Sequence, residues 1–109
     1  MSTLLPHPIA TYFANDNKGN TKAIAACFTE GAVVIDEGHT YSGRDAVRQW
    51  MANASTKYTY TSDPFSITEK GGEITVTSHL VGDFPGSPVD LRYLFVLDGD
   101  MIARLEILI

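Results

Sequence analysis

Apolar and polar residues alternate with two different periods along the chain. In the first half, apolar residues recur at the spacing of one helix face within residues 9–13, 21–28 and 44–53, which predicts three helices. The polar run 15–20 predicts the end of the first helix, and Gly31 suits the position just after the second. We therefore expect a mainly helical N-terminal half.

The second half has the two-residue period of β-strands, and a short β-branched strand also interrupts the helices. A loop, residues 37–43, follows that first strand. Pro64 predicts a bend or bulge within a strand, because proline lacks the N–H that a ladder needs. The glycine pair 71–72 and the Asp-Gly pair 98–99 are typical of tight hairpin turns. The strands expected are residues 32–36, 58–68, 73–82, 89–97 and 101–109.

The separation of helices from strands favours an α+β domain over alternating βαβ units, so the sheet should be largely antiparallel. A chain of 109 residues has the usual length of one domain. We expect residues 1–109 to form a single domain around one core.

Composition excludes several classes of protein. The 8 basic and 13 acidic residues give a formal charge of −5, and the basic residues are scattered, which argues against a nucleic-acid or anionic-membrane binder. Apolar residues make up 44% of the chain, enough for a folded core. The one cysteine, Cys27, lies in an apolar run and suits a small buried position. Without a basic leader or a long apolar run, the expectation is a soluble cytoplasmic protein.

Three segments carry a resemblance to a known family: the first helix with Tyr12, residues 28–36 (Phe-Thr-Glu-Gly-Ala-Val-Val-Ile-Asp) and residues 102–107 (Ile-Ala-Arg-Leu-Glu-Ile). The chain resembles the nuclear transport factor 2-like superfamily, and within it the SnoaL-like and ketosteroid-isomerase-like proteins. This resemblance implies a cone-shaped α+β fold, with three N-terminal helices packed in a curved, mostly antiparallel sheet around an apolar pocket. It also implies a single SnoaL-like domain over residues 1–109 and homodimers that pair through the sheet.

The resemblance further suggests catalytic positions. In ketosteroid isomerases an Asp general base works beside an oxyanion hole made from a Tyr and a protonated Asp. Asp36 matches the position of the base and Tyr12 that of the tyrosine. Tyr93 stands where those enzymes carry the second Asp, so it would donate a hydrogen bond from a phenol. The alternative for both tyrosines is that they only fill the core.

Physical reasoning from the residues alone leads to the same carboxylate. Asp36 ends an apolar strand, where partial burial would raise its pKa and let it take a proton from an acidic carbon. A structural alternative stays open, in which Asp36 accepts backbone N–H bonds from the turn at Gly38. His39, in the adjacent loop, is a candidate proton shuttle. The residues expected to contact a ligand are Trp50, His39, Leu105 and Ile107.

The remaining polar residues favour structural roles. Two carboxylates and two arginines on the last strands invite comparison with the Asp-Arg-Asp set of superfamily epoxide hydrolases, but strand alternation places them on the outer face, where ion pairs or dimer contacts are expected. These four residues are Asp90, Arg92, Arg104 and Glu106. The three histidines lack metal-ligand spacing, and no nucleotide or serine-nucleophile motif is present, so neither a metal nor a cofactor is predicted.

Two hypotheses of function remain. In the first, the pocket takes a small hydrophobic carbon acid, and the protein is a cofactor-independent acid–base enzyme of the isomerase or cyclase class. In the second, it is a non-catalytic ligand-binding or dimeric assembly module, and the sequence does not decide between them. Either one predicts a homodimer, because Leu94 and Val96 lie among charged residues on the outer face. Neither predicts a nucleic-acid or membrane partner.

Overall fold

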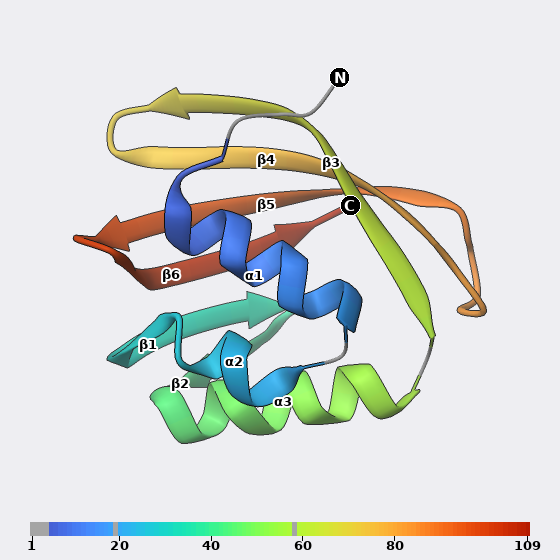
Figure 1. The fold of residues 1–109 in the computed structure, drawn as a ribbon, viewed down its shortest axis with the longest axis horizontal. Coiled ribbons are helices and arrows are strands. Elements are labelled where there is room, and N and C mark those ends of the chain that lie inside the picture. The colour runs from blue at the N-terminus through green and yellow to red at the C-terminus, as the bar shows by residue number, and fades with distance from the viewer. Residues whose placement is uncertain (1–4, 19, 58) are drawn as a thin grey trace.

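The computed structural model describes residues 5–18, 20–57 and 59–109, and the side chains of residues 54–57 are outside that description. Within the described residues, three helices and six strands follow one another (Figure 1). The helices are α1 (His7–Lys18), α2 (Thr21–Ala25) and α3 (Arg44–Lys57). The strands are β1 (Phe28–Asp36), β2 (His39–Ser42), β3 (Tyr60–Lys70), β4 (Glu73–Gly82), β5 (Val89–Asp98) and β6 (Met101–Leu108).

All six strands form one sheet in the order β2-β1-β6-β5-β4-β3. Only β1 and β6 pair in parallel, and every other neighbouring pair is antiparallel. Helix α1 contacts β3 and β6, while α3 contacts β1 and β2, so the helices cover one face of the curved sheet (Figure 1). The predicted α+β class is confirmed, with a mixed six-stranded sheet that is consistent with the cone-shaped fold.

The core lies between α1 and the inner face of the sheet. Tyr12 and Phe13 on α1 meet Tyr93 and Phe95 on β5 edge to face, with ring centroids 4.9–6.2 Å apart. Phe28 adds a further edge-to-face contact to Tyr12. The helical spacing of Tyr12 and Phe13 places both on the face that the sheet buries.

The second helix is shorter than predicted. Helix α2 ends at Ala25, and Phe28 begins β1, so Gly31 lies within a strand and not just after a helix. The ladder to β6 explains the difference, because Phe28 pairs with Ile102 and the Ile102 N–H donates to the Cys27 carbonyl over 2.7 Å. A tertiary partner therefore overrides the helical spacing of this segment.

The predicted loop 37–43 is also partly wrong, because residues 39–42 form β2. Asp36 pairs with His39, which leaves a two-residue hairpin turn made by Glu37 (φ 53°) and Gly38 (φ 77°). Positive φ at both positions is the geometry of a type I′ turn, which suits the twist of paired strands. This turn places Asp36 at the very end of β1.

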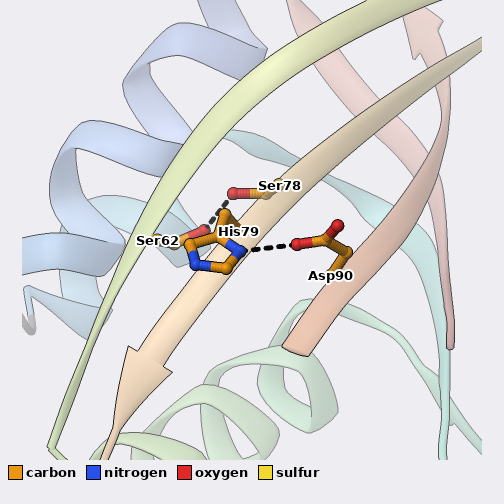
Figure 2. A network of polar contacts seen from close by, with 4 residues as sticks. All are labelled: Ser62, Ser78, His79 and Asp90. Carbon is orange, nitrogen blue, oxygen red and sulfur yellow. Dashed lines mark hydrogen bonds and ion pairs between the residues drawn. The ribbon is translucent and has the colours of Figure 1, made fainter. Parts of the chain in front are cut away.

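The strands of the second half follow the alternation closely. The ladder between β3 and β4 shifts register between Pro64 and Ser66, as the proline predicts, and residue 58, the expected start of β3, lies outside the described residues. Consecutive residues of β4 contact different partners, as Figure 2 shows: buried Ser78 meets Ser62 of β3, whereas exposed His79 meets Asp90 of β5.

Charged residues of the last strands point outward, as predicted. The His79 Nδ1 lies 2.6 Å from the Asp90 carboxylate, with both side chains about half exposed. Arg104 lies 3.2 Å from the Glu106 carboxylate and 3.9 Å from that of Glu73. Exposed ion pairs of this kind contribute little to stability, so the outer face is held mainly by the ladder itself.

Candidate functional site

A cavity of about 810 Å³ lies between the helices and the inner face of the sheet. Its walls are mainly aromatic and aliphatic, and the aromatic residues that line it are Tyr12, Tyr41, Trp50, Tyr60, Phe84 and Tyr93. Asp36 and Glu37 are its charged residues, and no Lys, Arg or His is found among the lining residues that the structure describes. A cavity of this size and character can hold a small, mostly apolar ligand.

Strand register brings three of the predicted site residues together. Asp36 on β1 pairs with Ile107 on β6, and Ile107 pairs in turn with Tyr93 on β5. Directly paired residues point to the same face of a sheet, so the three side chains form a row along one wall of the cavity. Tyr12 reaches the same cavity from α1, and Trp50 from α3.

Asp36 is held in place by an indole. The Trp50 Nε1–H donates to Oδ2 of Asp36 over 3.0 Å. Burial raises the pKa of the Asp36 carboxyl, and the hydrogen bond from Trp50 partly offsets that effect. The neighbouring charge of Glu37 acts in the same direction as burial. A carboxylate with a raised pKa is a stronger base than an exposed one, and this one borders an apolar space.

Trp50 owes its position to the spacing of α3. Val47, Trp50 and Met51 lie on the buried stripe of that helix, and Trp50 is only 6% exposed. Its ring also packs against Tyr41 of β2, with centroids 6.2 Å apart. An indole N–H is a donor only, so it favours the ionised form of the carboxylate, and the backbone N–H of Glu37 acts in the same direction.

Tyr12 and Tyr93 both line the cavity, and their rings pack edge to face with centroids 6.2 Å apart. Burial, and after it the charge of Asp16, raises the pKa of both phenols, so both stay protonated at neutral pH. The Tyr12 hydroxyl makes no hydrogen bond within the described part of the chain. Every fully buried side-chain oxygen and nitrogen in that part has a hydrogen-bond partner, so the Tyr12 hydroxyl is not fully buried. We infer that the Tyr12 hydroxyl is open to the cavity and free to donate.

Sequence reasoning missed a second carboxyl beside the cavity. Asp16 is 7% exposed, and the Tyr60 hydroxyl lies 2.6 Å from its Oδ1. Burial raises the pKa of Asp16 to about 6, although the hydrogen bond from Tyr60 opposes that shift. The available signal was that Asp16 follows Tyr12 by four residues and therefore shares its helix face. The prediction that α1 ends within residues 15–20 obscured it, since the helix runs through Lys18.

The model of the SnoaL-like domain matches residues 9–104. The chain belongs to the SnoaL-like domain family. This result confirms the resemblance carried by the first helix, residues 28–36 and residues 102–107. No protein of curated function matches the chain.

Solved structures of similar proteins extend the family assignment. A protein from Sinorhizobium meliloti, provisionally named a polyketide cyclase, is 38% identical, with a TM-score of 0.90 over 95% of each chain. A Catenulispora acidiphila protein with a ketosteroid isomerase-like fold, solved with trimethylamine, is 18% identical and has a TM-score of 0.84 over 97% of this chain and 87% of its own. An epoxide hydrolase/cyclase-like enzyme of pyran-ring formation in salinomycin is 22% identical and has a TM-score of 0.78 over 92% and 85%. The last two show likeness of fold.

Two residues expected to contact a ligand lie elsewhere in this SnoaL-like chain. Leu105 is fully buried in the core, beside Val34 and Phe95 in the ladder, and Ile107, two residues later, is the one that reaches the cavity. His39 is exposed on β2, because the hairpin turn places it across from Asp36 on an edge strand. Neither Leu105 nor His39 is among the residues that line the cavity.

Cys27 is buried, as predicted, and its Sγ lies 3.4 Å from the Ala23 carbonyl oxygen. Burial raises the pKa of its thiol, which disfavours the reactive thiolate. None of the helices in the described part of this SnoaL-like protein has the length and apolar character needed to cross a membrane.

Proposed function

We propose that this SnoaL-like protein is a cofactor-independent acid–base enzyme of the isomerase or cyclase class, acting on a small, mostly apolar carbon acid. The observation that carries the proposal is the Asp36 carboxylate, fixed by the Trp50 indole at the wall of an apolar cavity. Tyr12 and Tyr93 in the same cavity supply neutral hydrogen-bond donors.

In this mechanism, Asp36 removes a proton from a carbon next to a carbonyl group, and the C–H electron pair moves to the carbonyl oxygen. The phenol of Tyr12, with that of Tyr93 beside it, donates a hydrogen bond to the oxygen as its charge develops. Asp36 then returns the proton to a different carbon, which completes an isomerisation. Alternatively, the enolate carbon attacks a second carbonyl carbon of the same molecule and closes a ring, and the proton held by Asp36 passes to the alkoxide oxygen that this attack forms. Atoms and charge balance without any external reagent.

The lining of the cavity supports an uncharged substrate. Asp36 and Glu37 contribute negative charge, and no cation among the described lining residues offsets it. An anionic ligand would therefore be repelled. The provisional naming of the 38% identical relative as a polyketide cyclase agrees with a neutral ketone-rich substrate, and the trimethylamine complex of the more distant protein agrees with a small one.

The test uses 2-tetralone, a neutral bicyclic ketone whose α-hydrogens exchange with deuterium when a base removes them. We expect the protein to accelerate this exchange in D₂O, followed by proton NMR. The Asp36→Asn variant should lose at least about 100-fold of that acceleration, because an amide cannot accept the proton. Trp50→Phe should lose less of the acceleration, because it keeps the Asp36 carboxylate and removes only the hydrogen bond that orients it.

Asp90→Asn provides a matched control, because it makes the same chemical change on the exposed outer face. It should exchange 2-tetralone at the wild-type rate. A loss well below tenfold in a folded Asp36→Asn variant would rule out the base role. Binding of 2-tetralone without accelerated exchange in the wild type would favour a non-catalytic binding module.

A further inference from the structure

Asp16 and Tyr60 form a buried pair that the mechanism above does not use. Tyr60 lines the cavity, whereas Asp16 lies behind it on α1 and does not reach the cavity. Their oxygens are 2.6 Å apart, a short distance typical of a hydrogen bond in which one partner carries or shares charge. Asp16 therefore touches a cavity ligand only through the Tyr60 hydroxyl.

No cation compensates Asp16 within the described residues. None of the ion pairs found there includes Asp16, and the titratable groups around it are the phenols of Tyr12, Tyr60 and Tyr93. The charges of Asp16 and Asp36 both raise the pKa of these phenols. A buried carboxylate without a cationic partner is costly, and holding a proton removes that cost.

The direction of the hydrogen bond depends on that proton. When Asp16 is ionised, the Tyr60 hydroxyl must donate to Oδ1 of Asp16, so its oxygen can only accept from a ligand. When Asp16 is protonated, its own hydroxyl donates to the Tyr60 oxygen, and the Tyr60 hydrogen is free to turn toward the cavity. The hydrogen bond from Asp16 to Tyr60 and the one from Tyr60 to the ligand would then run in the same direction, and each would strengthen the other.

We propose that Asp16 is a positioning residue that acts through Tyr60: in its protonated form it turns the Tyr60 hydroxyl into a hydrogen-bond donor for a carbonyl oxygen in the cavity. The inference rests on the proposed function in taking a carbonyl compound as the ligand, but it does not require Asp36 to be a base. In this arrangement the hydrogen-bond donor, Tyr60 with Asp16 behind it, comes from β3 and α1, whereas the proposed base, Asp36, comes from β1.

The experiment measures binding, not turnover. Trp50, the only tryptophan of the sequence, lines the cavity and reports binding by its fluorescence. The ligands are 2-tetralone, which accepts but does not donate, and tetralin, the same ring system without the carbonyl. If only the protonated pair binds the carbonyl, affinity for 2-tetralone should fall about thirtyfold between about pH 5 and about pH 7.5, because Asp16 loses its proton near pH 6. Affinity for tetralin should stay constant.

Two variants separate this role from a structural one. Asp16→Asn keeps a neutral donor next to Tyr60, so it should bind 2-tetralone at both pH values as tightly as the wild type does at about pH 5. Tyr60→Phe removes the donor and should bind 2-tetralone weakly at both values, with tetralin binding retained. Asp90→Asn, on the outer face, should behave as the wild type. Repeating the series in an Asp36→Asn background removes the titration of the other carboxyl.

The inference is overturned if wild-type affinity for 2-tetralone does not change with pH, if 2-tetralone does not bind at about pH 5, or if folded Asp16→Asn loses binding as Tyr60→Phe does. Its failure is distinct from failure of the proposed function. Loss of exchange activity in Asp36→Asn concerns the base, whereas the pH dependence of binding concerns only Asp16 and Tyr60.

Discussion

Two carboxyl groups, Asp36 in the wall of the cavity and Asp16 behind it, differ in what they touch. Asp36 accepts a hydrogen bond from a pure donor, the Trp50 indole, which favours its ionised form. Asp16 meets a phenol, which can donate or accept, and it is more deeply buried. Different surroundings thus separate two chemically identical side chains into a base, Asp36, and a carboxyl group, Asp16, that keeps its proton up to about pH 6.

Asp16 should make stability depend on pH. Its pKa is raised from 3.8 to about 6 in the folded state, so the folded protein binds the proton more tightly than the unfolded chain. The contribution of Asp16 to the free energy of unfolding is therefore largest below about pH 4, falls as the pH rises to about 6, and is level above it. Asp16→Asn should remove this fall and raise the free energy of unfolding at neutral pH by about 2–3 kcal/mol, at about 1.4 kcal/mol for each pKa unit.

Urea unfolding at about pH 4, 5, 6 and 7.5 measures this effect, with exposed Asp100→Asn as the matched control. The control should follow the wild-type pH dependence. An Asp16→Asn variant with the same pH dependence as the wild type would show that Asp16 is ionised in the folded protein.

At the scale of elements, one side chain joins α1 to the edge strand β3. The Asn17 Oδ1 accepts from the Ser62 N–H over 2.6 Å, and its Nδ2 donates to the Ser62 carbonyl over 2.9 Å. The amide thus takes the place of a neighbouring strand at the free edge of the sheet. Because Asp16 precedes Asn17 and Tyr60 lies two residues before Ser62, this clamp also sets the distance between the buried pair.

Asn17→Ala should lower the free energy of unfolding by about 1–3 kcal/mol, because it removes two hydrogen bonds and leaves the Ser62 backbone groups without that partner. Asn15→Ala is the matched control, since the Asn15 side chain donates to the Thr11 carbonyl of the same helix, over 2.8 Å, and does not join two elements among the described residues. Urea unfolding gives the difference, and amide exchange at Ser62 locates it. Equal effects of the two variants would contradict a clamp between α1 and β3.

The same scale shows how far the sequence could predict the structure. Residues 73–82 form the strand their alternation predicts, because a two-residue period with one buried face leaves no other register. The spacing of residues 21–28 predicts a helix that ends near Phe28, with Gly31 just beyond it. Only the parallel ladder to β6, remote in sequence, makes residues 28–31 a strand. The hydrophobic pattern of a segment contains no information about a strand partner that is remote in sequence.

Part of the candidate site could likewise be predicted from the sequence, and part could not. Asp36, Tyr12 and Tyr93 were located by spacing and by resemblance, and their roles remain predictions. Asp16 and Tyr60 could not be paired from the sequence, because they lie 44 residues apart and their contact depends on how β3 crosses α1. A polar residue near a helix end is usually solvated, so burial of Asp16 follows from the fold and not from its neighbours in sequence.

At the scale of the molecule, the sheet has one covered face and one open face. The helices cover the inner face, while on the outer face Leu94 and Val96 of β5 lie between polar residues of β4 and charged residues of β6. Leu94 pairs with Thr75 on one side and Glu106 on the other. Aliphatic residues at the centre of a patch with charges around them are typical of an interface between two copies of a chain.

We therefore expect a homodimer that pairs through this outer face. Light scattering at micromolar concentration should give twice the 11.9 kDa of one chain. Leu94→Glu should shift the mass to that of a monomer, because a twofold axis brings each new charge against its copy or against other acidic residues of the patch. Ala14→Glu, an exposed change on helix α1 on the other side of the sheet, should leave the dimer intact. A mass of 11.9 kDa for the wild type at every concentration would refute the interface. The predictions for Asp36 and Asp16 would stand unchanged, because the cavity lies on the other side of the sheet.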